Sequence, residues 1–398
     1  VWIAPINGIP QGNYEPIMLL ITPKRTQMYD LKMNYELTKN TFVNIETALS
    51  NNDLNTFSSI GNSQNVGFAM RFMLENTVDL QKRKNKGKDV VWKMHNVLNY
   101  ETKNKLFDPI ENYRDVEFMR NYNLTDSLLD AAEHFANAQI GFYRKNYGRI
   151  QWNSHVFFIP THSWNAHRHN FVTDMKINTY KLFVDASALQ TTSPEYTSVF
   201  VKHKEIVSKE FRYFEIGVRE EMEYNELRDQ VANVLLSSSY AFNEAGIFLK
   251  NNDSLHKSFA YHISYDNRID KNVFHRSLDI SSIAHEVKAG VDFLKFANHP
   301  LRLTASYRNL TYKDSLATTQ IPENTLLTNA DYQGRFLKGA IQVGVFYELG
   351  SGMEQKNAYS YLKVADGQGV YQWIDYNQNG IEELDEFEVA IYKDQANY

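Results

Sequence analysis

The sequence predicts an all-β protein in which many hairpins follow one another as an antiparallel meander. Apolar and polar residues alternate through most of the chain, which is the pattern of a strand with two unlike faces. Aromatic residues, which favour strands, are abundant, with 25 Tyr and 24 Phe. Strand-like segments do not alternate with helical segments along the chain, which is typical of an antiparallel rather than a βαβ architecture.

The segment 340–349 shows this pattern most clearly. Its residues divide between the two faces of a strand, because successive side chains point in opposite directions. Phe346 interrupts the second face, which is otherwise small or polar, and Gly350–Gly352 is typical of a turn that ends the strand. The apolar face carries Ile341, Val343, Val345, Tyr347 and Leu349.

The composition excludes several classes of protein. A hydrophobic share of 43% with 22% charged residues indicates a folded chain rather than a disordered one. A formal net charge of −5 gives no general attraction to nucleic acid, so we expect no nucleic-acid partner. The cysteine count is zero, which excludes disulfides, thiol nucleophiles and cysteine metal sites.

The start of the chain and its hydropathy set two further expectations. Val1 is not an initiator Met and no leader-like segment follows it, so we expect a removed leader or a fragment of something longer. No run of about 18 or more apolar residues is present, so the sequence predicts no transmembrane helix.

We expect three parts: an irregular lead-in at 1–28, the antiparallel meander at 29–365 and a calcium-loop-like segment at 366–398. Tyr29–Leu37 and the alternating residues 43–49 form the clearest hairpin of the first half, with a short turn between them.

The next part of the chain contains further predicted strands and two less regular segments. Val66–Leu74, Val90–Tyr100 and Asp115–Asn123 are predicted strands. The basic run Lys82–Lys88 could contact anionic lipid headgroups, but a solvated hairpin loop is the favoured interpretation. Thr125–Asn137 is ambiguous, because Thr125 could cap a helix before the alternation resumes.

Two polar segments are candidate sites. His167 and His169 share a strand face within His162–His169 and could chelate a metal, but a polar loop is favoured because the run contains no carboxylate. The acidic run Glu220–Arg228 could supply catalytic carboxylates, but nothing nearby would shift their pKa values, so a solvated face or loop is favoured.

The second half of the chain is more regular. Ala241–Leu249 and Phe259–Tyr265 form a strong predicted hairpin. The alternating residues 287–293 and 301–307 form another, and its polar face carries Arg302 and Arg308. We count about sixteen to eighteen predicted strands by the alternation rule.

Two architectures share this periodicity. In a soluble sandwich or barrel the apolar residues pack inward, whereas in a whole or partial outer-membrane β-barrel they face lipid. Strand lengths near ten residues, charged second faces and aromatic residues near strand ends favour the membrane barrel. Four charged residues argue against it by interrupting the pattern: Lys32, Lys93, Asp185 and Glu215.

The segment 375–386 matches the twelve-residue calcium loop. Gly380 stands at position six, where the loop turns sharply, and calcium prefers six to eight oxygen ligands. The flanking residues Gly367–Ile374 do not have a helical pattern, so we expect a structural staple rather than a sensor. The alternative is an Asn-Gly turn that binds nothing, and a helix at Glu386–Gln395 could follow. The candidate calcium ligands are Asp375, Asn377, Asn379, Ile381 through its carbonyl, Glu383 and Glu386.

Three segments resemble parts of large, uncharacterised surface or outer-membrane β-proteins of the Bacteroidota. They are Asp108–Asn123, Pro322–Tyr332 and a segment of the final third that comprises Tyr359–Val364, Gly367–Gly369 and Asp375–Tyr398. The resemblance implies a Gram-negative outer membrane or cell surface, an antiparallel β fold and a longer parent protein, and it implies no known activity.

These observations rank three functions. The first is an outer-membrane β-barrel, or part of one, that serves transport, translocation or surface assembly, with outer-membrane lipid and envelope proteins as partners. The second is a soluble periplasmic or surface β-protein that binds a glycan or a protein. The third, an enzyme such as a hydrolase, ranks last because no phosphate-binding loop, nucleophile elbow or zinc-protease motif is present. We therefore expect no enzyme.

Overall fold

The computed structural model describes residues 22–85, 88–125, 128, 131–251, 258–274, 276–296, 298–313, 323–351, 360–365 and 367–398, without the side chains of 81–91. The chain divides into two compact units, Val1–Ser351 and Gly352–Tyr398. Most of the expected lead-in at 1–28 falls outside the described residues.

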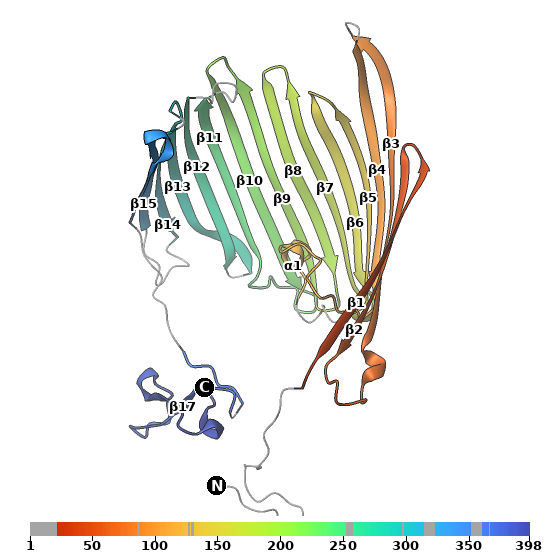
Figure 1. Cartoon of the computed structure of the whole chain (residues 1–398), viewed down its shortest axis with the longest axis vertical. Coiled ribbons are helices and arrows are strands. Elements are labelled where there is room, and N and C mark those ends of the chain that lie inside the picture. Colours follow the sequence, from red (N-terminus) through yellow and green to blue (C-terminus); the bar gives the residue numbers. More distant parts are fainter. Residues whose placement is uncertain are drawn as a thin grey trace, which may run out of the picture. The chain divides into compact units, whose positions relative to one another are not determined.

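The first unit is one sheet of sixteen strands in sequence order, each antiparallel to its neighbours (Figure 1). This confirms the predicted all-β meander. No hydrogen-bonded ladder joins β1 to β16 in the described part of the chain, so the sheet is not closed into a barrel. The strands are β1 (Arg25–Thr38), β2 (Thr41–Asp53), β3 (Val66–Asn85), β4 (Lys88–Lys103), β5 (Glu133–Arg144), β6 (Gly148–Ile159), β7 (Trp164–Ile177), β8 (Tyr180–Thr192), β9 (Tyr196–Glu210), β10 (Phe214–Asp229), β11 (Tyr240–Asn251), β12 (Phe259–Phe274), β13 (Ser277–Phe293), β14 (Leu301–Tyr312), β15 (Glu323–Phe336) and β16 (Ile341–Ser351).

The second unit contains a two-stranded antiparallel sheet, β17 (Tyr371–Trp373) with β18 (Phe387–Val389). The described residues contain few helical turns, and none of their helices is long and apolar enough to cross a membrane. The helical segments are α1 (Phe118–Tyr122) and the 3₁₀ turns Asn62–Gln64, Pro160–His162, Leu337–Gly339, Leu384–Glu386 and Lys393–Gln395.

The strands of the large sheet are unusually long. The shortest, β16, has 11 residues and the longest, β3, has 20, whereas strands in globular proteins usually have about 3–10. The predicted hairpins at 241–265 and 287–307 lie within β11–β12 and β13–β14, and both pairings are confirmed.

The connections at the two ends of the sheet differ in length. Those that follow odd-numbered strands have at most seven residues, and we call this the short-connection end. Those that follow even-numbered strands include 54–65, 230–239 and the 29 residues of 104–132, and we call this the long-connection end. Successive strands run in opposite directions, so the chain reaches the two ends of the sheet in turn. The longest insertions all follow even-numbered strands and therefore lie at the same end.

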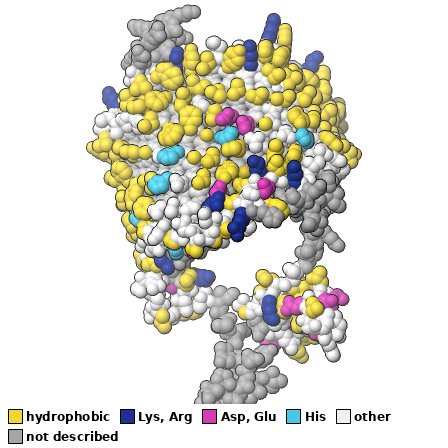
Figure 2. Space-filling view, turned by 180° about the vertical axis from the view of Figure 1, so that it is seen from behind, with side chains coloured by type: hydrophobic (Ala, Val, Ile, Leu, Met, Phe, Trp, Pro, Cys, Tyr) yellow, Lys and Arg dark blue, Asp and Glu magenta, His cyan; other side chains and the backbone are white. Residues whose placement is uncertain are grey.

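One face of the sheet is apolar and exposed. A single register row of apolar residues crosses eight consecutive strands on this face. Leu31 of β1 is 72% exposed and Ile247 of β11 is 58% exposed, so nothing in the described chain covers them. Figure 2 shows hydrophobic side chains over much of this face. The row consists of Leu182, Val207, Val218, Ile247, Tyr265, Val287, Tyr307 and Leu326.

The opposite face is polar and cross-linked by ion pairs. The four charged residues that interrupt the sequence pattern (Lys32, Lys93, Asp185 and Glu215) all lie on this face, one residue out of step with the apolar row. Buried carboxylates are paired there, as charges removed from water must be. The pairs include Lys32–Glu46, Arg71–Glu101, Lys181–Glu215, Arg219–Asp266, Lys288–Glu286 and Arg302–Asp292.

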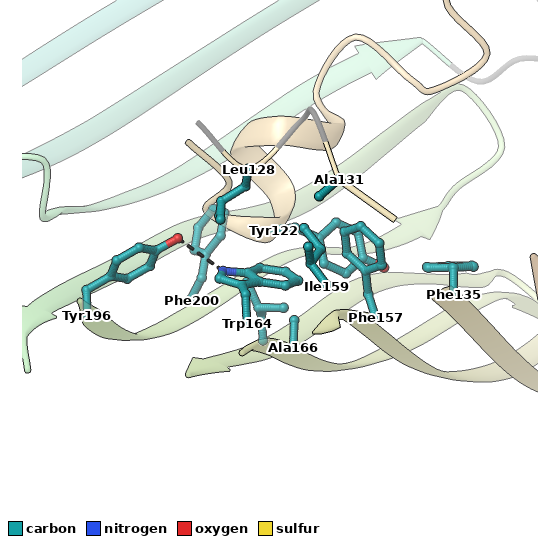
Figure 3. Close-up of a cluster of buried hydrophobic side chains, with 11 residues drawn as sticks. Tyr122, Leu128, Ala131, Phe135, Phe157, Ile159, Trp164, Ala166, Tyr196 and Phe200 are labelled. Atoms are coloured by element: carbon teal, nitrogen blue, oxygen red, sulfur yellow. Dashed lines mark hydrogen bonds between the residues drawn. The ribbon is translucent and has the colours of Figure 1, made fainter. Parts of the chain in front are cut away.

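The hydrophobic core of the first unit lies on the polar face, beneath α1 (Figure 3). Trp164 is fully buried at its centre, and its indole nitrogen donates to the Tyr196 hydroxyl at 3.1 Å. The ring of Phe157 packs edge-on against Trp164, with 5.1 Å between their centroids. The core consists of Tyr122, Leu128, Ala131, Phe135, Phe157, Ile159, Trp164, Ala166, Leu189, Tyr196 and Phe200.

Two secondary-structure predictions are wrong. Asp115–Asn123 contains the helical turn α1 instead of a strand, because Phe118 and Tyr122, four residues apart, both face the core. Glu386–Gln395 contains β18 instead of a helix, because the backbone of Phe387–Val389 pairs with β17. The ambiguous segment Thr125–Asn137 lies partly outside the described residues, and β5 begins within it.

Replacing Phe157 with Ala tests the position of the core. We expect Phe157→Ala to lower the free energy of unfolding by about 3–5 kcal/mol, because the lost ring leaves a cavity. The same truncation of an exposed residue, Ile247→Ala, should cost no more than about 1 kcal/mol. Equilibrium denaturant unfolding of both variants measures the difference, and equal losses would contradict this assignment of the core.

Candidate functional site

A segment between β4 and β5 crosses the polar face, and we call its described residues 104–125 the strap. It begins over β2 and β3. The Asn104 side chain accepts a hydrogen bond from the Phe68 amide at 3.0 Å, and the Asp108 amide donates to the Ser50 hydroxyl at 3.0 Å. At Gly67 the strap backbone approaches so closely that a Cβ would lie 2.2 Å from Phe107. Only glycine permits this crossing.

Arg114 fixes the middle of the strap to the sheet. Its guanidinium donates to Glu101 of β4 at 2.9 Å and lies 3.5 Å from Glu133 of β5. The same group lies over the rings of Phe118 and Phe135, at 4.6 and 5.4 Å from their centroids. A half-buried guanidinium stabilised by two carboxylates and aromatic faces is a strong attachment for an otherwise irregular segment.

Asn123 fixes the far end of the strap. It adopts a left-handed conformation (φ 52°) directly after α1, a position that favours Asn or Gly. Its side-chain amide forms a reciprocal buried pair with Asn225 of β10, at 2.9 and 3.0 Å, and also donates to Ser198 of β9 at 2.9 Å. The Tyr196 hydroxyl donates to the Asn123 carbonyl.

Two charged contacts extend this attachment. Arg120 pairs with Glu223 of β10, whose carboxylate also accepts from the Tyr240 hydroxyl at 2.8 Å. Lys202 of β9 donates to the Asn121 side chain at 2.7 Å. The strap therefore spans the polar face from β2 to β11, where Arg120 donates to Tyr240, and is bonded to strands near both ends and at Arg114.

The α1 turn places one buried phenol against the sheet. Burial raises the pKa of Tyr122 to about 12, although the neighbouring Arg168 and Arg114 lower it. The phenol is therefore protonated at neutral pH, and it lies 3.3 Å from the ring nitrogen Nδ1 of His155 on β6.

A cavity of about 790 Å³ lies between the strap and the polar face of β1–β7. This volume is within the range of about 300–1,000 Å³ that is typical of small-molecule sites. Its walls combine paired charges with aromatic rings, a lining that could accept a polar molecule with an apolar face. Residues that line it include Met28, Arg71, Glu101, Arg114, Phe118 and Arg168.

The predicted calcium loop lies in the second unit, and four of its six candidate ligands come together. The Asp375 carboxylate accepts from the amides of Asn379 (3.1 Å) and Gly380 (2.8 Å), and Gly380 has φ 71°. The Asn377 oxygen accepts from the Asn379 amide at 3.0 Å. The Asn377 side-chain nitrogen donates to Glu383 at 2.6 Å, which brings a second carboxylate to the loop.

The other two candidates are placed differently. Ile381 would contribute only its carbonyl, and its side chain is 62% exposed. Glu386 is 3% exposed and accepts from the Trp373 indole at 2.9 Å and from the Tyr376 amide at 3.2 Å. Glu386 therefore anchors the base of the loop to β17. The all-oxygen donor set fits calcium at four positions, whereas bidentate binding by Glu386 would require it to exchange these two hydrogen bonds.

The histidine run contains no metal cluster. His167 and His169 share the apolar face of β7, and His169 lies 3.1 Å from the Ser154 hydroxyl and beside the ring of Trp152. In the described part of the chain, no group of three or more His, Asp or Glu side chains is arranged to hold a metal. The basic run Lys82–Lys88 falls at the β3–β4 hairpin, and its side chains lie outside the described residues.

A scan against protein-family models and a search of the curated proteins both found no match to this chain. Membership in a family therefore stays a prediction that rests on the sequence resemblance.

Sequence reasoning missed the strap as a functional element, although the signals for it were present. Asp108-Pro109 breaks the strand pattern, and the following residues to Glu117 do not alternate cleanly. Asn123 is a typical residue after a helix end. No local pattern could have shown that these residues fold back over the sheet, because Asp108 bonds to a residue 58 positions earlier and the partners of Asn123 and Arg120 lie 75 to 120 positions later.

The Asn123–Asn225 pair offers a test of the strap attachment. We expect Asn123→Ala to destabilise the protein by about 1–3 kcal/mol, because it leaves a buried amide without its partner. Protease cleavage within residues 107–117 should then become faster. Glu117→Ala, which removes an exposed ion pair, serves as the control and should leave cleavage unchanged.

The double variant separates this pair from general damage. Adding Asn225→Ala to Asn123→Ala should cost little more than the single change, because the unpaired amide is then removed. Fully additive losses would show that the two amides do not act on each other.

Proposed function

We propose that this chain forms part of the wall of an outer-membrane β-barrel that serves transport, translocation or surface assembly. The observation that carries the proposal is the exposed apolar face, which runs across the sheet opposite the face that holds the ion pairs and the core. A soluble protein in water would cover such a surface, because contiguous exposed apolar patches larger than a few hundred Å² are rare on soluble monomers.

Strand length supports the same proposal. A tilted barrel strand needs about 9–11 residues to cross a bilayer, and every strand of the large sheet has at least 11. The alternation of an apolar outside with a polar inside is the signature of membrane barrels. The charged residues that interrupt the sequence pattern no longer argue against this, since they lie on the polar face.

In this proposal the polar face lines the lumen and the strap narrows it. The strap is bonded to strands from β2 to β11, so it is a fixed constriction rather than a loose loop. The cavity beneath it is lined by charges of both signs, which suits a passage for polar cargo more than selection for one ion.

The remaining parts of the proposal rest on sequence. The resemblance to Bacteroidota surface proteins favours a Gram-negative outer membrane, with lipid and envelope proteins as partners. The loop Asp375–Glu386 is proposed as a calcium staple that stabilises the second unit rather than as a sensor. No enzymatic activity is proposed.

A soluble periplasmic or surface protein that binds a glycan or a protein is the second candidate. The cavity beneath the strap is the observation that favours it, because aromatic rings beside paired charges also suit a sugar. This candidate requires a cover for the apolar face, so the two proposals differ in what that face contacts.

Adjacent residues at the centre of β5 test the lipid-facing assignment. Ile140 is 49% exposed on the apolar face, and Gln139 lies on the polar face. We expect Ile140→Lys to destabilise the protein in bilayers by about 2–4 kcal/mol, because a charge enters hydrocarbon. Gln139→Lys should change stability by less than about 1 kcal/mol. Unfolding of both variants in lipid vesicles measures the difference.

Trp152, which neighbours Ile140 on β6, provides an independent readout. It is 49% exposed on the apolar face, so lipids brominated on their chains should quench it. In a Trp92→Phe background, Trp152→Phe should remove most of the quenching, because Trp92 alternates onto the same face as Met94 whereas Trp164 is buried on the other face. Tolerance of Ile140→Lys together with unquenched Trp152 would overturn the membrane proposal.

Calcium titration of the full chain tests the staple. We expect calcium to bind and to raise the stability of the second unit, and Asp375→Ala to weaken binding by about tenfold or more, because it removes a charged ligand. Glu388→Gln is the matched control, because this carboxylate accepts from Tyr376 but lies outside the loop. Calorimetry without detectable calcium binding would leave the loop as a metal-free Asn-Gly turn.

A further inference from the structure

The apolar face carries a band of polar residues that the proposed function does not use. Five of the chain's 12 histidines lie on this face. Figure 2 shows histidines spread across this face, with hydrophobic side chains above them. We call the set the histidine band: His134, His167, His169, His203 and His285, together with Asn243, Asn267 and Asn309.

The register shows that this band follows a regular line. The ladder that begins at His134 on β5 reaches Thr197 on β9. The ladder from His285 on β13 reaches Glu205 on the same strand. Residues 197 and 205 are eight apart, and β5 and β13 are eight strands apart. The band therefore shifts by one residue per strand towards the short-connection end. His167 falls on this line, and His169 and His203 lie two residues from it towards the short-connection end.

In a barrel whose strands are tilted, a line at constant height along the barrel axis crosses the strands with this same slope. One residue of rise is about 3.3 Å and neighbouring strands are about 4.8 Å apart, which gives an angle of about 35°. Strands of membrane barrels tilt by about 35–45° from the barrel axis. Side chains that follow this line therefore lie at one height when the strands have that tilt.

The band has a continuous run of apolar residues on one side and a mixed surface on the other. From Asn267 towards the short-connection end, the apolar face of β12 carries Tyr265, Ile263, Tyr261 and Phe259. This rise of eight residues corresponds to about 26 Å along the strand and about 20 Å in height, close to the apolar belt of about 25 Å in membrane barrels. Towards the long-connection end the same face turns mixed, with Lys271 on β12.

Aromatic residues orient two of these histidines. The Tyr100 hydroxyl lies 2.8 Å from Nδ1 of His134, and the Tyr265 hydroxyl lies 2.8 Å from Nδ1 of His285. Each pair bridges neighbouring strands on the apolar face. When the phenol donates to Nδ1, the imidazole holds its proton on Nε2 and becomes a donor. Amphipathic rings of this kind collect where a membrane meets water.

We propose that the histidine band marks the level at which the sheet leaves the bilayer on the side of its long connections, with its histidines donating hydrogen bonds to the phosphate groups of phospholipid headgroups. This inference rests on the proposed membrane location. The lipid occupies the apolar belt between the band and the short-connection end, and the rest of the strands extends beyond it into water. Glu205 and its ladder partner Glu220 lie about three to four residues from the line towards the short-connection end, so these two carboxylates interrupt the belt on β9 and β10.

A labelling scan along one strand tests the boundary. The chain contains no cysteine, so single-cysteine variants carry one label each. On the apolar face of β14, Leu303→Cys lies in the belt, Asn309→Cys in the band and Thr311→Cys beyond it, and Ser306→Cys on the polar face is the control. Each variant is labelled with an environment-sensitive fluorophore in phospholipid vesicles and quenched by iodide, by chain-labelled lipid or by headgroup-labelled lipid.

We expect the label at 303 to emit at shorter wavelength and to be quenched by lipid alone, and the labels at 306 and 311 to be quenched by iodide alone. The label at 309 should be quenched most by headgroup-labelled lipid. If 311 behaves like 303, the boundary is elsewhere although the membrane location stands. If iodide quenches all four labels, the membrane location itself is wrong.

A second measurement tests the phosphate contact. The triple variant His134→Leu/His169→Leu/His285→Leu should retain fewer phospholipid molecules after purification than the native chain, as measured by mass spectrometry. His162→Leu, in the exposed 3₁₀ turn before β7, is the control and should retain the native number. Unchanged retention in the triple variant would overturn the proposed hydrogen bonds to phosphate.

Discussion

The strict alternation of side chains along paired strands is the constraint on which this structure depends. A strand can present apolar residues to one side only by presenting every second residue to the other. Sixteen strands paired with few register shifts carry this division across the whole sheet, as the row from Leu182 to Leu326 shows. The two faces therefore have opposite chemistry, and each needs a different environment.

The described part of the chain satisfies the polar face by itself and leaves the apolar face open. Ion pairs such as Arg219–Asp266 neutralise buried charge on the polar face, and the strap supplies aromatic residues that pack with Trp164 and Phe157 into the core. This is the reverse of a soluble sheet, in which the apolar face forms the core. The position of the core supports a membrane location more strongly than any single motif does.

Much of this architecture could be predicted from sequence, because alternation is a local signal. The strand at 341–351 and the hairpin of β11 with β12 follow from their own residues. Which face meets the core could not be predicted, since the period is the same in both cases. The strap was missed because Asn123 finds its partners on β9 and β10, far away in sequence. The candidate calcium loop could be predicted from the spacing of its oxygen-bearing residues. The burial of Glu386 against Trp373 could not, because it depends on the pairing of β17 with β18.

Bound detergent measures most directly whether the apolar face contacts lipid. Light scattering coupled to size-exclusion chromatography gives the mass of detergent carried by each chain. The membrane account predicts a substantial belt of detergent around the protein and aggregation once detergent is removed. A monodisperse chain in plain buffer without bound detergent would contradict it, because the apolar face would then have to be covered by protein.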